Sequence, residues 1–212
     1  MTGAAPGVVR RVLGIDPGSR VTGWGVVERA GAAHERPRLV GCGTIRAPQD
    51  EAFPLRLARI HAGVRALLDE HAPDALVVEE AFGGKSVRSA LRLGEARAVC
   101  VLAGALAARP VHELSPALVK KVVAGHGAAG KEAVRSAVLR AVTHAPARLP
   151  ALDAADALAL ALAALLRLEA PAVLLGHAPI GRQAGPGRGR RWTLAHVEEL
   201  ARGGAGPGAA RP

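Results

Sequence analysis

Acidic residues stand at the ends of two apolar segments, where they could act together on a cation. Asp16 follows the apolar run 12–15, and both Glu79 and Glu80 close the apolar run that begins at residue 75. Ligands of open α/β sheets usually bind beyond the ends of adjacent central strands. We therefore expect these acids to meet at one edge of a sheet.

Two further acids, Asp153 and Asp156, open the most apolar helix that the sequence predicts, residues 151–168. Their spacing of three residues puts them on one face of that helix. Asp156 is followed by alternating alanine and leucine. A carboxylate on such a helix is costly unless it is paired or binds a metal ion.

Each of these acids also has a plain structural interpretation. Asp16 begins an Asp-Pro-Gly sequence, which is typical of turns. Asp153 could cap its helix, and Asp156 could form an ordinary salt bridge. The residues alone leave the choice between Glu79 and Glu80 open.

The acids point to hydrolysis of a phosphodiester if they converge. Their charges would repel and raise one another's pKa, and a divalent cation would relieve that repulsion. Oxygen ligands suit Mg²⁺ or Mn²⁺ rather than zinc, and two such ions can activate water and stabilise a leaving oxygen. The formal net charge of +10 favours an anionic partner such as nucleic acid. A basic protein with an acidic cleft is typical of a nuclease or polymerase.

Ten segments must position these residues, in the order of three strands, a helix, a strand, a helix, a strand and three helices. The expected strands are 12–15, 23–28, 39–46, 75–79 and 111–113. The expected helices are 53–70, 86–108, one that opens at Ser115-Pro116, 131–143 and 151–168. This order predicts an α/β fold with a five-stranded mixed sheet flanked by helices.

The chain divides by composition into a flexible lead-in over residues 1–10, one domain over 11–169 and a tail over 170–212. The tail is rich in Gly, Pro and Arg, and we expect it to be disordered and basic. The longest uncharged apolar stretches, 98–108 and 157–166, are far shorter than the ~20 residues of a membrane span. With no secretory signal and only two distant cysteines, a cytoplasmic protein without a membrane partner is expected.

Four segments carry a family resemblance. The sequences GIDPGSRVTGWGVVE (14–28), VVEEAF (77–82), SALRLGEARAV (89–99) and DAADALALA (153–161) resemble the bacterial RuvC family of Holliday-junction resolvases. The resemblance runs from about residue 11 to 168. It implies an RNase H-like fold, a homodimer and Mg²⁺-dependent symmetric cleavage of four-way DNA junctions. It also implies a RuvA–RuvB branch-migration complex as partner.

The resemblance assigns roles to particular residues. It implies that the metal ligands and catalytic acids are Asp16, Glu79, Asp153 and Asp156. Glu79 is selected over Glu80 because the family has an acid, two residues and then phenylalanine.

DNA contacts are also implied. Phe82 matches an aromatic residue that stacks on bases near the crossover, and stacking needs no sequence code. Lys120 and Lys131 match lysines near the scissile phosphate, whereas Lys121 has weaker support. Arg88 lies on the expected helix 86–108, where contact with a backbone phosphate and a plain surface position are equally good interpretations.

Two other functions fit part of this pattern. A junction-binding protein without cleavage activity would have the same basic character, but it would have no use for four acids near DNA. Another RNase H-like nuclease, acting on RNA–DNA hybrids, would use the same acids. Cleavage of a four-way junction, a linear duplex and a hybrid would separate the three.

Overall fold

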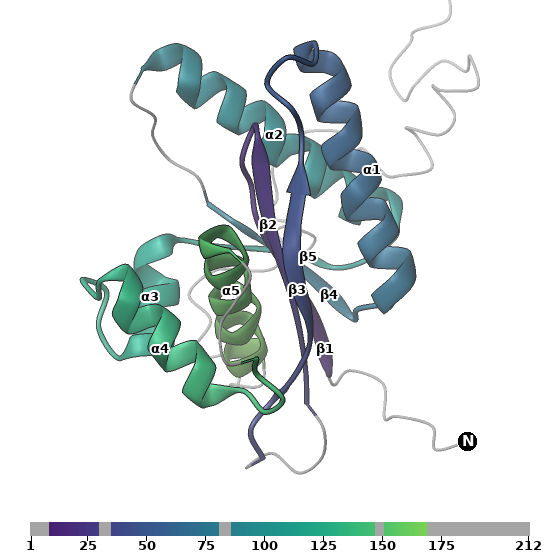
Figure 1. Cartoon of the computed structure of the whole chain (residues 1–212). Helices are drawn as coiled ribbons and strands as arrows, with labels where there is room; N and C mark the ends of the chain where they lie inside the picture. Colours follow the sequence, from purple (N-terminus) through teal and green to yellow (C-terminus); the bar gives the residue numbers. More distant parts are fainter. Residues whose placement is uncertain (1–8, 30–34, 81–85, 147–150, 169–212) are drawn as a thin grey trace, which may run out of the picture. The chain divides into compact units, whose positions relative to one another are not determined.

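Five strands form one mixed sheet in the computed structural model of the protein (Figure 1). The strands are β1 (Arg11–Asp16), β2 (Val21–Glu28), β3 (Arg38–Arg46), β4 (Ala75–Glu79) and β5 (Val111–Leu114). Their order in the sheet is β3-β2-β1-β4-β5. The first three form an antiparallel meander, while β4 runs parallel to β1 and β5 runs parallel to β4.

The structure describes residues 9–29, 35–80, 86–146 and 151–168. All of them lie in the first of the two units into which the chain divides, Met1–Gly181. The predicted tail 170–212 lies outside the described residues, as do residues 1–8 of the predicted lead-in and Phe82.

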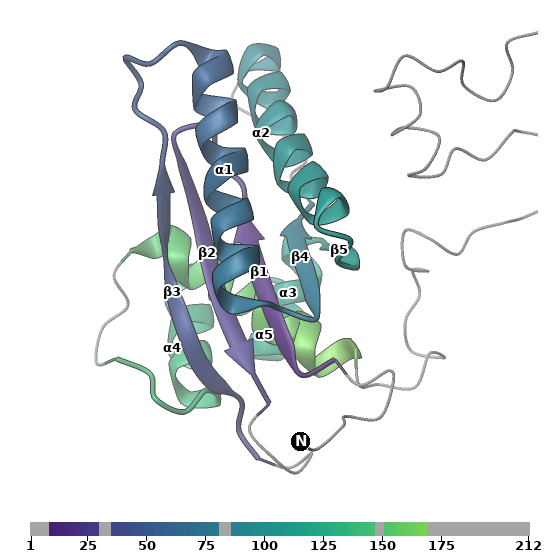
Figure 2. The same ribbon diagram turned by 90° about the vertical axis from the view of Figure 1, so that its right-hand side faces the viewer.

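Helices cover both faces of the sheet (Figures 1 and 2). One face carries α1 (Phe53–His71) and α2 (Val87–Leu106), and the other carries α3 (Pro116–Ala124), α4 (Lys131–Ala141) and α5 (Leu152–Leu168). Alternate strand residues point to opposite faces. Val12 and Val77 therefore pack with α5, while Leu13 and Leu76 pack with α1 and α2. Among the described helices, none is long and apolar enough to cross a membrane.

The predicted elements are all present, and the predicted α/β class with a mixed five-stranded sheet is confirmed. Three ends differ by two residues: β2 begins at Val21 rather than 23, α2 ends at Leu106 rather than 108, and α4 ends at Ala141 rather than 143. Thr143 instead pairs with the start of β3, where its carbonyl accepts a hydrogen bond from the Leu39 amide at 3.0 Å. That partner is distant in sequence, so helical periodicity alone could not reveal it.

The backbone of α5 lies directly on β1 and β2, because glycine faces it on both strands. A Cβ atom on Gly14 would lie 2.3 Å from the backbone oxygen of Ala157. A Cβ atom on Gly23 would lie 2.0 Å from the backbone oxygen of Asp153. Gly23 pairs with Asp16 across the two strands, so this approach brings the first turn of α5 to the end of β1.

We expect Gly14→Ala to lower the free energy of unfolding by about 2–3 kcal/mol, because the added methyl group must push α5 off the sheet. Gly94→Ala is the matched control, since a Cβ atom there meets nothing within 4 Å. Gly94 is exposed within α2, so this control should raise stability by roughly 0.5–1 kcal/mol. Urea denaturation measures both. Equal stabilities for the two variants would contradict the close approach of α5.

Candidate active site

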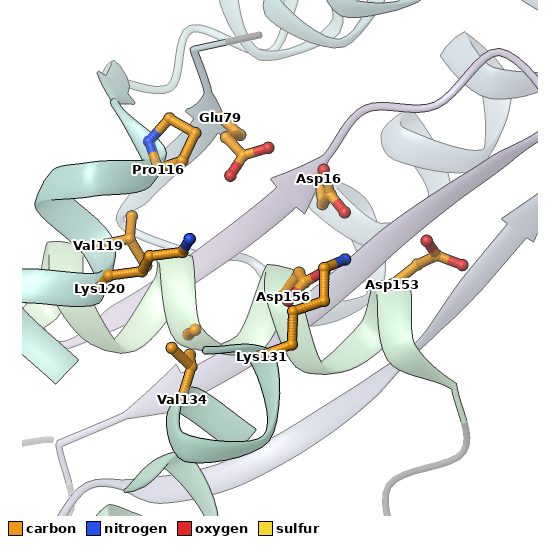
Figure 3. Close-up of a pocket in the computed structure, with 10 residues that line it drawn as sticks. Asp16, Glu79, Pro116, Val119, Lys120, Lys131, Val134, Asp153 and Asp156 are labelled. Carbon is orange, nitrogen blue, oxygen red and sulfur yellow. The ribbon is translucent and has the colours of Figure 1, made fainter. Parts of the chain in front are cut away.

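One pocket at the carboxyl ends of β1 and β4 gathers the predicted acids (Figure 3). Asp16 is the last residue of β1 and Glu79 is the last residue of β4. The two strands are parallel neighbours with Ile15 opposite Val78, so the two carboxylates emerge at the same level of the sheet. The pocket is lined by Asp16, Glu79, Pro116, Val119, Lys120, Lys131, Val134, Asp153, Asp156 and Ala159.

The first two turns of α5 supply the other two acids. Asp153 lies inside the helix, one residue after its start at Leu152, so the cap interpretation does not hold. Asp156 follows three residues later and lines the same pocket. Three elements that are far apart in sequence therefore bring all four predicted acids together.

Glu80 takes a different position from Glu79. Its backbone amide donates a hydrogen bond to the Leu114 carbonyl at 2.9 Å, which continues the pairing with β5. Successive side chains of an extended segment point to opposite faces. Glu79 lines the pocket, whereas Glu80 is not among the described residues that line it.

The acids raise one another's pKa. Burial and the nearby charges of Glu79, Asp156 and Asp153 raise the pKa of Asp16 to about 8. The pKa of Glu79 is also raised, chiefly by burial and then by Asp156, although a hydrogen bond with Asp16 opposes this. Both shifts favour protonation of this pair of carboxyl groups, because each is buried beside another acid.

Two lysines reach the pocket from the neighbouring helices, Lys120 from α3 and Lys131 from α4 (Figure 3). Lys131 Nζ lies 3.2 Å from Asp156 Oδ2, so the salt-bridge interpretation of Asp156 is confirmed. The Lys131 side chain is 74% exposed. Asp156 raises the pKa of Lys131, as expected for an ammonium beside a carboxylate. An exposed ion pair of this kind contributes little to stability, so Asp156 remains available to another cation.

The other predicted contact residues lie outside this pocket. Lys121 is exposed on α3 and Arg88 is exposed in the first turn of α2. Neither is among the described residues that line the pocket. Phe82 is not described, so its predicted place beside the acids stays a prediction.

Sequence reasoning missed the apolar wall of the pocket and one buried arginine. Pro116, Val119 and Val134 form that wall, and none of these residue types signals a site. Arg56 is buried in α1. Arg56 lies four residues before Ile60, on the buried face of the helix, where an apolar residue is expected. An arginine in that position was the signal that could have revealed it.

The donor set fits a hard divalent cation. All four acids offer oxygen, which Mg²⁺ and Mn²⁺ prefer, and a cation would relieve the repulsion that raises the pKa of Asp16. In the described part of the chain, no group of three or more His, Cys, Asp or Glu side chains is arranged closely enough to hold a metal ion. We therefore expect the carboxylates to rotate inward when a cation binds.

The metal-free protein should lose stability as the pH rises. The raised pKa of Asp16 means that the folded protein keeps a proton that the unfolded chain releases above about pH 4. This stabilisation is complete below about pH 4 and disappears as the pH passes about 8. In EDTA, the melting temperature should fall between about pH 4 and pH 8, and Asp16→Asn should flatten that fall. Identical pH profiles for the two proteins would contradict the coupling of the acids.

Comparison with known proteins places this chain in a family. Residues 12–164 match the family model described as "Crossover junction endodeoxyribonuclease RuvC". The protein of that name from Methylorubrum populi is 41% identical over 180 residues, which cover 85% of this chain and 92% of the relative. The one from Chloroflexus aggregans is 45% identical over 152 residues, which cover 72% of this chain and 90% of the relative.

Solved structures agree with the sequence relatives. The structure titled "T. thermophilus RuvC in complex with Holliday junction substrate" superposes with a TM-score of 0.68 at 35% identity, covering 74% of this chain and 94% of that chain. A second Thermus thermophilus RuvC structure gives a TM-score of 0.65 at 36% identity, covering 74% and 93%. The family model, the relatives and the superposed sheet agree, and the chain therefore belongs to the RuvC family and has its RNase H-like fold.

Proposed function

We propose that the protein is a Mg²⁺-dependent endodeoxyribonuclease that resolves Holliday junctions in recombination and DNA repair. The observation that carries the proposal is the convergence of four carboxylates and two lysines in one pocket. The relative from Thermus thermophilus is titled as a complex with Holliday junction substrate. A homodimer would present two such pockets, which suits paired cuts in two opposed strands.

The four acids act as cation ligands in this proposal. Asp16, Glu79, Asp153 and Asp156 would hold two Mg²⁺ ions, for which Mn²⁺ could substitute. Bound there, divalent ions supply the Lewis acidity that activates water and stabilises a leaving oxygen. In-line attack on the phosphodiester would leave 5′-phosphate and 3′-hydroxyl ends, which a ligase can join.

The two lysines offset the negative charge of the scissile phosphate. Lys120 extends into the pocket from α3, and Lys131 lies at its rim beside Asp156. An ammonium group near the phosphate stabilises charge that develops during cleavage. Lys131 can turn from Asp156 to the phosphate because its side chain is mostly exposed.

The remaining DNA contacts follow from charge and from the family resemblance. A protein with a net charge of +10 is attracted to the phosphate backbone. Lys121 and Arg88 are exposed and could each contact a backbone phosphate. We propose that Phe82 stacks on an unpaired base near the crossover. A RuvA–RuvB complex as partner and a cytoplasmic location complete the proposal.

Asp16→Asn should abolish cleavage and spare DNA binding. Loss of one ligand charge removes several kcal/mol of stabilisation, so we expect single-turnover cleavage in Mg²⁺ to slow by about 1000-fold. Junction affinity in EDTA should stay the same or rise, because repulsion between the pocket and the phosphates falls. Glu79→Gln should behave in the same way. The neighbouring Glu80→Gln is the matched control and should cleave at nearly the wild-type rate.

The same assay separates the alternative functions. Wild-type protein that binds a four-way junction but never nicks it in Mg²⁺ would be a binding protein. Faster cleavage of an RNA–DNA hybrid than of the junction would indicate a different substrate. If folded Asp16→Asn loses junction binding as completely as cleavage, Asp16 is a turn residue and the proposed cation site is wrong.

Two adjacent lysines allow a paired test of charge stabilisation. Lys120→Met removes a cation that lines the pocket and should slow single-turnover cleavage by about 100-fold. Lys121→Met removes a cation from the exposed side of the same helix and should change that rate little. Both variants keep the long side chain and the helix. Equal losses in the two variants would show that only the overall charge of α3 matters.

A further inference from the structure

Two buried polar side chains serve a single turn beside the acids. In the described part of the chain, the only buried polar or charged residues are Thr22 and Arg56, which are 0% and 6% exposed. Thr22 is the second residue of β2, and Arg56 lies in the first turn of α1. Both bind the backbone of residues 17–20, the turn that directly follows Asp16.

The Thr22 hydroxyl closes this turn from inside. Its Oγ1 donates a hydrogen bond to the Gly18 carbonyl at 2.9 Å and accepts one from the Gly18 amide at 3.3 Å. The turn is tight at this point, since a Cβ atom on Gly18 would lie 2.0 Å from the Val21 backbone oxygen. One hydroxyl can make both bonds because it is donor and acceptor at once.

Arg56 holds the next residue of the turn from the helix side. Its Nη2 donates a hydrogen bond to the Ser19 carbonyl. The guanidinium carbon of Arg56 lies 5.4 Å from the centre of the Phe53 ring. The guanidinium carbon of Arg92, on α2, lies 4.1 Å from the centre of the same ring. The aromatic ring therefore holds the arginine in place and connects it with α2.

Three consecutive carbonyls of the turn are thus fixed by three different parts of the chain. The Gly18 carbonyl accepts a hydrogen bond from Thr22, and the Ser19 carbonyl accepts one from Arg56. The Arg20 carbonyl accepts a hydrogen bond from the Ala47 amide at 2.8 Å, just beyond β3. A turn that only had to reverse the chain would not need a buried guanidinium, whose desolvation is costly.

Fixing the turn over residues 17–20 restrains the residue that precedes it, Asp16. Asp16 lines one pocket together with three other acids, Glu79, Asp153 and Asp156, so its position decides whether the four can share a cation. Pro17 connects it to the fixed carbonyls with little freedom, because its ring restricts the backbone. A catalytic group misplaced by about 1 Å can lose about 100-fold in rate, so such a restraint has value.

We propose that Arg56 and Thr22 are positioning residues that hold the Asp16 carboxylate where it can bind a cation jointly with Glu79. The inference rests on the proposed function, because it assumes a cation at these acids. Neither residue lines the pocket among the residues described, so each acts through the turn and Asp16.

Mn²⁺ binding by the free protein tests the proposal without cleavage. We expect Arg56→Met and Thr22→Val each to weaken calorimetric Mn²⁺ affinity by about tenfold, which is typical of groups that orient metal ligands. The Gly18 amide should also exchange its hydrogen faster. Arg59→Met is the matched control on the same helix, since Arg59 is exposed and pairs with Glu51. Its Mn²⁺ affinity should equal that of the wild type. Thr22→Ser keeps the hydroxyl and should recover most of the affinity.

The possible outcomes are distinct. Folded Arg56→Met and Thr22→Val proteins that bind Mn²⁺ as tightly as the wild type would overturn the proposal. Failure of both variants to fold would also overturn it, because the two side chains would then serve global stability. A wild-type protein without Mn²⁺ binding would instead refute the cation site itself, and the positioning claim with it.

Discussion

The backbone of α5 rests on the backbone of β1 and β2, and the rest of the site depends on that contact. Glycine at positions 14 and 23 leaves no side chain between the helix and the sheet. The first turns of α5 therefore reach the end of β1, where Asp153 and Asp156 meet Asp16. Parallel pairing of β1 with β4 adds Glu79 at the same level. A larger residue at position 14 or 23 would push α5 away and widen the gap between the acids of the two layers.

This packing forces like charges together, and the surrounding structure must resist their repulsion. The apolar face of α5 holds Asp153 and Asp156 from one side, because its Ala and Leu residues between positions 154 and 165 are buried. The turn anchored by Thr22 and Arg56 holds Asp16 from the other side. Lys131 neutralises part of the charge through its ion pair with Asp156. A bound cation would relieve the repulsion that remains among these acids.

Apolar runs and helical spacing predicted most of the fold, because both depend on local sequence. The strand 75–79 and the start of α5 were predictable in this way, and with them the approach of the acids. The early end of α4 was not, because Thr143 pairs with a strand a hundred residues earlier. The choice of Glu79 over Glu80 needed either the family pattern or the pairing with β5. Arg56 was missed because its partner is a backbone carbonyl, which no side-chain pattern reveals.

A crystal soaked in Mn²⁺ would show whether the four carboxylates form one site for divalent cations. Anomalous scattering locates Mn²⁺ without reference to activity. We expect peaks in this pocket about 2.0–2.3 Å from oxygens of Asp16, Glu79 and the two aspartates of α5. Asp16→Asn crystals should lose at least one of these peaks. Strong Mn²⁺ peaks elsewhere on the molecule, with this pocket empty at the same Mn²⁺ concentration, would show that the four carboxylates form no cation site.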